Sequence, residues 1–100
     1  MSLTPLVSAE FRFLLYVADH TQNSVVAVAN LKALCAVHLP GRHEVEVVDV
    51  FKEPERALAD RIYMTPTLIR LAPLPVRRIV GTLSQVERVL HALGLEPISE

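Results

Sequence analysis

Hydrophobic positions follow two different periods in the first half of the chain. The stretch FRFLLYVAD, residues 11–19, is almost continuously apolar after Arg12, which is typical of a strand buried on both faces of a sheet. After it, apolar residues recur at helical spacing up to Leu39, with Thr21 as a candidate N-cap and Pro40-Gly41 as the stop. The residues at this spacing, which predict one apolar inner face, are Val25, Val28, Leu31, Leu34, Cys35 and His38/Leu39.

The next segment, HEVEVVDVF, residues 43–51, alternates strictly at its start. Its first two valines fall on one face of a strand, and Glu44 and Glu46 fall on the other. Exposed charge discourages unwanted pairing, so we expect an edge strand. Pro54 then suits the first turn of a short helix, because its missing N–H would have no intrahelical partner there.

The second half of the chain predicts a hairpin and a final helix. Two short strands, residues 67–72 and 76–81, are separated only by Pro-Leu-Pro. In SQVERVLHALG we expect Ser84 and Glu87 to form a capping box and Gly94 to end the helix. The element order is therefore β-α-β-α-β-β-α, an α/β fold with the thioredoxin-like arrangement.

Length and composition indicate one small domain of 100 residues. We expect residues 1–10 to be a lead-in, 11–95 the folded domain and 96–100 a short tail. Apolar residues make up 51% of the chain and the mean hydropathy is +0.35. A domain of this size buries only about 60–65% of its unfolded surface. Either the core is rich, or copies of the chain or a partner cover part of its surface.

Charge and hydropathy exclude several classes of function. The net charge of −1 lacks the clustered basic surplus of a nucleic-acid binder. Charges interrupt the apolar stretches well before the ~20 residues that a membrane span needs. The N-terminal residues lack the basic start and long apolar centre of a signal peptide. We therefore expect a cytoplasmic protein.

A polar Thr-Pro-Thr precedes the third strand, as in the loop that faces the active site of thioredoxins. Those enzymes carry Cys-x-x-Cys at the start of the first helix, where amide dipoles lower the thiol pKa. This chain has DHTQNS there, and its single cysteine, Cys35, lies about four turns further on. A thiol oxidoreductase is therefore nearly excluded, and Cys35 is predicted to be a small core residue.

Other catalytic constellations are also missing from the sequence. The four histidines have no metal-binding spacing, and the glycines at 41, 81 and 94 are too scattered for a phosphate loop. We expect no enzyme activity, no cofactor and no metal site.

Four arginines gather around Thr-Pro-Thr and the hairpin: Arg61, Arg70, Arg77 and Arg78. Ordinary surface charge that offsets the glutamates explains many such residues. Arginine is nevertheless enriched at binding surfaces, because its planar fork suits carboxylates and aromatic faces. We interpret the four as a partner-binding face.

Several motifs are spread from about Phe11 to Leu95: LYVA, T-x-N-S, VVDV, DRIYMTPTL and PLPVRRIVG-x-LS. Together they resemble the KaiB family of bacterial circadian clock proteins. The resemblance implies a non-enzymatic regulator with two folds. One is a resting homo-oligomer, a tetramer or dimer, and the other is a thioredoxin-like monomer that binds the first ATPase ring of KaiC. The bound form captures KaiA and displaces a SasA-type sensor kinase.

The resemblance also suggests roles for particular residues. Arg61, Arg70 and Arg78 match basic positions implicated in partner contacts, so a KaiC-type ATPase is the expected partner. Glu44 and Glu46 stand where clock members have small or basic residues near KaiA, which makes KaiA a doubtful partner.

Four further positions are candidates for the change between the two folds. Pro66, Pro73 and Pro75 are candidate switch or turn residues, because X-Pro bonds isomerise slowly. Ala92 stands where family members often carry glycine, and alanine favours a helix. The role would lie in circadian timing or a related stress-adaptation system. The alternative is a stand-alone sensory domain of the SasA histidine-kinase type.

Overall fold

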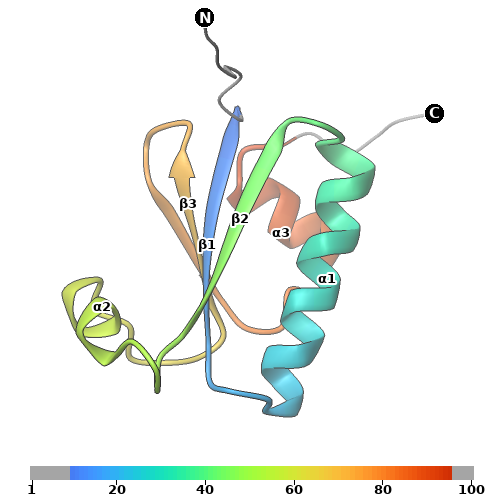
Figure 1. The fold of residues 1–100 in the computed structure, drawn as a ribbon. Helices are drawn as coiled ribbons and strands as arrows, with labels where there is room; N and C mark the ends of the chain where they lie inside the picture. The colour runs from blue at the N-terminus through green and yellow to red at the C-terminus, as the bar shows by residue number, and fades with distance from the viewer. Residues whose placement is uncertain (1–9, 96–100) are drawn as a thin grey trace, which may run out of the picture.

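The computed structural model describes residues 10–95, so nearly all of the predicted lead-in and the whole predicted tail lie outside the described residues. Figure 1 shows a sheet with helices on both sides. Along the chain the elements are β1 (Phe11–Val17), α1 (Gln22–His38), β2 (His43–Asp49), α2 (Pro54–Ala59), β3 (Thr67–Ala72), β4 (Arg77–Val80) and α3 (Val86–Ala92).

The four strands form one sheet in the order β2-β1-β3-β4. β1 pairs in parallel with β2 and antiparallel with β3, and β3 and β4 form an antiparallel hairpin. The predicted β-α-β-α-β-β-α order is confirmed, as is the edge position of β2. Within the described residues, no helix combines the length and apolar character that crossing a membrane takes.

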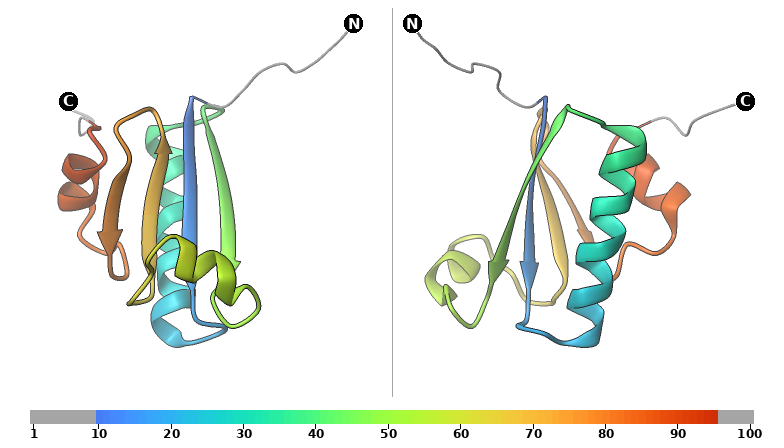
Figure 2. Two further views of the ribbon diagram at one scale, coloured as in Figure 1. Left: turned by 90° about the vertical axis from the view of Figure 1, so that its left-hand side faces the viewer. Right: turned by 45° about the vertical axis from the view of Figure 1, so that its right-hand side comes forward.

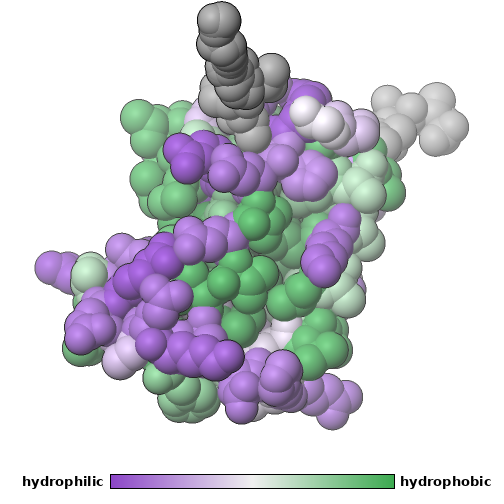
Figure 3. All heavy atoms as spheres, viewed as in Figure 1, coloured by the Kyte–Doolittle hydropathy of each residue, from purple (hydrophilic) through white to green (hydrophobic). Residues whose placement is uncertain are grey.

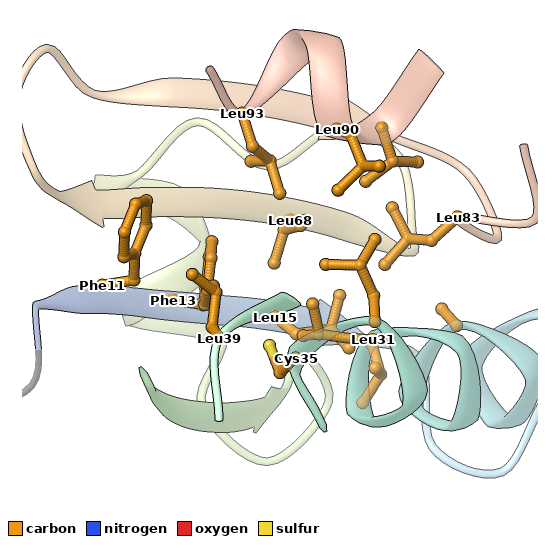
Figure 4. Packing of buried hydrophobic residues seen from close by; sticks show 14 residues of the cluster. Phe11, Phe13, Leu15, Leu31, Cys35, Leu39, Leu68, Leu83, Leu90 and Leu93 are labelled. Carbon is orange, nitrogen blue, oxygen red and sulfur yellow. The ribbon is translucent and has the colours of Figure 1, made fainter. Parts of the chain in front are cut away.

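β1 is buried on both faces, as its apolar run predicts. α1 and α3 cover one face of the sheet, and α2 covers the other near the carboxyl ends of β1 and β2 (Figure 2). On the first face, Phe13 and Leu15 of β1 pack with side chains from α1 and α3 (Figure 4). On the second face, Leu14 and Tyr16 pack with Ala57 of α2. Strand periodicity thus divides one apolar segment between two cores.

α1 differs from the prediction at its N-terminal end. Thr21 is the N-cap residue, but its hydroxyl donates to Ser24 Oγ at 2.9 Å and makes no cap bond to the backbone. Ser24 is buried, and Val25 is 54% exposed, so its predicted place on the inner face is wrong. The reason is that Ser24 and Ala27 form the buried face at this end of the helix, so Val25 between them points outward.

α3 begins one residue later than predicted. Its N-cap is Gln85, and Ser84 Oγ lies 3.1 Å from Thr82 Oγ1, so the predicted capping box with Glu87 is wrong. Leu83 is 5% exposed with a φ of +64°, and burying it turns the chain before the helix can start. Gly94 ends the helix as predicted, with a φ of +75°. Ala92 is the last helical residue, not an interior one.

Tyr16 fastens α2 to the sheet. Its fully buried hydroxyl donates to Asp60 Oδ2 at 2.5 Å and lies 3.2 Å from the carbonyl oxygen of Arg56. Burial, followed by the hydrogen bond to Asp60, raises the pKa of Tyr16 from 10.0 to about 12. A side chain from the middle of the sheet thus anchors the only helix on this face of the described domain.

Tyr16→Phe is expected to destabilise the domain by about 1–2 kcal/mol, because it removes a hydrogen bond to a carboxylate and leaves the Asp60 oxygen without it. The raised pKa favours the folded state fully below pH 10.0, and this contribution is lost as the pH rises through about 12. In the variant, which has no phenol at this position, the free energy of unfolding should therefore fall less between pH 10.0 and about 12 than in the wild type. Urea unfolding across this pH range measures both effects. Tyr63→Phe is the matched control, since Tyr63 is 82% exposed. Equal unfolding curves for the two variants would contradict the anchoring role.

Candidate functional site

The Thr-Pro-Thr loop lies beside the carboxyl end of β1. Thr67 pairs with Tyr16 across the sheet, so the buried Pro66 directly before it stands near the segment that leads from β1 into α1. The Pro66 carbonyl accepts a hydrogen bond of 2.9 Å from Gly81 N, and Thr67 Oγ1 donates to Met64 O at 2.5 Å. The peptide bonds before the three predicted turn prolines, Pro66, Pro73 and Pro75, are cis. The loop thus has the thioredoxin-like position that the sequence predicts.

No sulfur stands in the segment between β1 and α1. Ser24 Oγ accepts hydrogen bonds of 2.9 Å from the amide of Ala18 and from the hydroxyl of Thr21. Ser24 is 1% exposed, and both contacts tie it to the turn around Asp19, whose φ is +53°. Its oxygen therefore stabilises the start of α1 rather than facing a substrate.

Cys35 belongs to the core between α1 and the sheet, as predicted. It is 0% exposed, and burial raises its pKa from 9.0 to about 11. A buried thiol with a raised pKa carries little thiolate, which is the reactive form. This environment is the opposite of the one that activates a redox cysteine.

The thiol of Cys35 is expected to react with iodoacetamide at least roughly 100-fold more slowly in the folded protein than in concentrated guanidinium, at mildly alkaline pH. Both the smaller thiolate fraction and the lack of access contribute to this. The measurement is mass spectrometry of the alkylated chain over time. Rapid alkylation of the folded protein would show that the site opens to solvent.

Within residues 10–95, no group of three or more histidine, cysteine or acidic side chains is placed to hold a metal ion. His43 Nδ1 lies 2.7 Å from the carbonyl oxygen of Leu39, which places this ring at the turn between α1 and β2. This contact of His43 is therefore structural.

The structure divides the four predicted partner-binding arginines between the two faces of the sheet. Arg61 and Arg78 lie on the α2 side, where Arg78 Nη1 donates to Arg61 O at 3.2 Å. Arg77 is exposed and is the β-pair partner of Arg70 on the opposite side. Arg70 is 5% exposed, and burial lowers its pKa. The four do not form one face, because neighbouring residues of a strand point in opposite directions.

Exposed apolar side chains stand on α2 and its two flanking loops, close to Arg61 in the sequence. We call these residues and Arg61 the α2 surface: Phe51, Leu58, Arg61, Tyr63 and Met64. Its four apolar members are between 63% and 82% exposed. α2 and its two flanking loops carry them, and Figure 1 shows that this region projects from the sheet. No sequence motif pointed to the four apolar residues as a binding surface, although Tyr63 and Met64 stand outside any strand or helix period.

A groove runs between α1 and the edge strand β2. It has a volume of about 610 Å³, and Val25, Val28 and Val47 line it together with charged residues of both signs, among them Lys32 and Asp49. In Figure 3, apolar side chains reach the surface in the middle of this view, between polar groups on both sides. Part of the surplus apolar content therefore lies on the surface.

On the other face of β2, the two predicted exposed glutamates are in ion pairs. Glu44 lies 3.5 Å from Arg12, and Glu46 lies 2.8 Å from Arg56. A hydrogen bond from Arg56 lowers the pKa of Glu46. The acidic edge is thus confirmed, and it is partly neutralised by the neighbouring strand and helix.

These features define a thioredoxin-like domain whose cysteine lies in the core and not at the start of α1. The fold resembles that of the germline-specific thioredoxin Deadhead from Drosophila melanogaster, with a TM-score of 0.70 at 15% identity over 87% of this chain and 81% of that one. It also resembles the N-terminal domain of SasA from Synechococcus elongatus, with a TM-score of 0.70 at 21% identity over 99% of each chain.

The sequence relatives then specify the family. The KaiB domain matches residues 14–95. The circadian clock oscillator protein KaiB of Synechococcus elongatus is 49% identical over 81 residues, which are 81% of this chain and 79% of that protein. The KaiB of Nostoc punctiforme is 47% identical over 88 residues, 86% of this chain and 85% of that protein. The chain belongs to the KaiB family of circadian clock proteins.

Proposed function

We propose that this chain is a non-enzymatic regulator that binds the N-terminal ATPase ring of a KaiC-type protein. The observation that carries the proposal is the α2 surface of a KaiB-family domain. Its four large apolar side chains are mostly exposed, and one arginine stands among them in the sequence. Large exposed apolar patches on small domains mark interaction sites. Aromatic residues, methionine and arginine are also the types enriched in protein interfaces.

Arg61 is the proposed charged contact on this surface. It is exposed, whereas Arg70 is buried and the guanidinium of Arg78 is bonded to backbone carbonyls. Arg77 is exposed too, but it lies beside Arg70 on the opposite face of the sheet from α2. The partner-binding role proposed for the four arginines is therefore concentrated on Arg61. An acidic patch on the ring would complement it and raise the association rate.

Arg61→Glu is expected to weaken binding to a KaiC-type ring at least roughly tenfold, because a charge in a docking patch becomes repulsive. Affinity is measured by interferometry with the assembled, ATP-loaded ring. Arg88→Glu is the matched control, since Arg88 is an exposed arginine of α3 away from the α2 surface. Equal affinity of the Arg61→Glu variant and the wild type would remove the α2 surface from the interface.

Two further partners follow from the same proposal. The fold shared with the SasA N-terminal domain supports competition with a SasA-type kinase for the ring. A KaiA-type protein is expected to bind weakly, because Glu44 and Glu46 place acidic charge along the free edge of β2.

The proposal includes a second, oligomeric form that covers exposed apolar surface such as Val25 and Val47. Two packings of one sequence interconvert only if they differ by a few kcal/mol. Small local contributions to the free energy then change the populations of the two forms. The helix propensity of residues 84–94 is one such contribution.

Ala92→Gly is expected to lower the thioredoxin-like fraction, because glycine disfavours a helix by up to about 1 kcal/mol relative to alanine. The change should be several-fold at most, since Ala92 is the last residue of α3. NMR of the amides of residues 84–94 counts the forms, and sedimentation gives their masses. An unchanged ratio would show that helix propensity at this position does not set the balance.

A further inference from the structure

α2 and α3 end in the same way, although they lie on opposite faces of the sheet. At the end of α2, Arg61 has a φ of +57°, which is rare for a residue with a side chain. Its amide donates to Leu58 O at 3.0 Å, and the amide of Ile62 donates to Ala57 O at 2.9 Å. These two hydrogen bonds, 6→1 and 5→2, together form a Schellman motif.

At the end of α3, Gly94 takes the place of Arg61, with a φ of +75°. Its amide donates to His91 O at 3.1 Å, and the amide of Leu95 donates to Leu90 O at 2.8 Å. The two helices thus share one termination geometry, but only α3 uses glycine for it. α2 must hold a non-glycine residue in the left-handed conformation.

An arginine of the β3–β4 hairpin closes each of these helix ends. From β4, Arg78 donates to Asp60 O and, at 3.2 Å, to Arg61 O. From β3, Arg70 donates to Leu93 O and, at 2.6 Å, to Pro75 O. Asp60 and Leu93 are the C-cap residues of the two helices. Corresponding carbonyls therefore receive a guanidinium on each face.

The chemistry of a short helix gives these contacts their importance. α2 has 6 residues and α3 has 7, and the last four carbonyls of any helix lack intrahelical partners. Helices this short are marginal by themselves. A cation at the C-terminus satisfies those carbonyls and opposes the helix dipole. On α3 the approach is so close that a Cβ on Gly94 would lie 3.2 Å from Arg70 Nη1.

We propose that Arg78 is a positioning residue for the α2 surface, and that Arg70 is its counterpart on α3. Arg78 holds the carbonyl of Arg61 and so keeps this member of the α2 surface in its left-handed conformation. The consequence for binding rests on the function proposed above, whereas the clamp itself is a property of the free domain.

Comparison of Arg78→Gln with Arg77→Gln distinguishes the loss of the hydrogen bonds to the end of α2 from the loss of a positive charge. Both remove one exposed positive charge from β4, but only Arg78 donates to the end of α2. Hydrogen exchange of the Arg61 and Ile62 amides, measured by NMR without a partner, should become at least about tenfold faster in Arg78→Gln, as expected when hydrogen bonds from a charged donor are lost. Arg77→Gln should leave it unchanged. The amide of Leu95, on the α3 clamp, is the internal control and should not change in either variant.

Arg78→Lys tests the fork geometry, because lysine keeps the charge but presents a single ammonium. Its exchange rates should fall between those of the wild type and Arg78→Gln. Affinity for the KaiC-type ring should fall in the same order. If the Arg61 and Ile62 amides exchange at an unchanged rate in Arg78→Gln, the clamp is overturned. If this variant also loses affinity for the ring, Arg78 contacts the ring directly instead. Faster exchange in Arg78→Gln together with no ring binding by the wild type keeps the clamp and overturns the proposed function.

Discussion

The burial of β1 on both faces is the constraint on which the other elements depend. A strand with apolar side chains in both directions needs neighbours on both edges and a layer on both faces. β2 and β3 supply the edges, α1 and α3 one layer, and α2 the other. Tyr16 adds a polar contact to this apolar frame, because its hydroxyl reaches Asp60 from the middle of the sheet.

The two layers are unequal, and this inequality creates the surface proposed for binding. α1 has 17 residues, whereas α2 has 6. A helix of one and a half turns cannot enclose the large apolar side chains around it, so Leu58 and its neighbours are exposed. The same fold that serves thiol chemistry in thioredoxins here buries its one cysteine and exposes an apolar patch. Fold alone therefore does not specify function, and the surface does.

The hairpin connects these two layers. Alternation along β3 and β4 directs Arg70 to one face and Arg78 to the other, and each reaches a helix end. Residues that look alike in the sequence thus have different roles: Arg70 and Arg78 donate to helix ends of their own domain, whereas Arg61 and Arg77 are exposed.

The sequence by itself determined the element order, the central β1, the edge position of β2 and the absence of a redox pair. All of these depend on periodicity or composition within a few residues. The tertiary structure decided the late start of α3, the exposure of Val25 and the burial of Arg70. It also decided which arginines are bonded to helix ends of the domain. The reason is that these features depend on contacts between distant residues: Arg70 meets a carbonyl 23 positions away, and Tyr16 meets a carboxylate 44 positions away. A local pattern records the residue types, but only the packed sheet determines which of them meet.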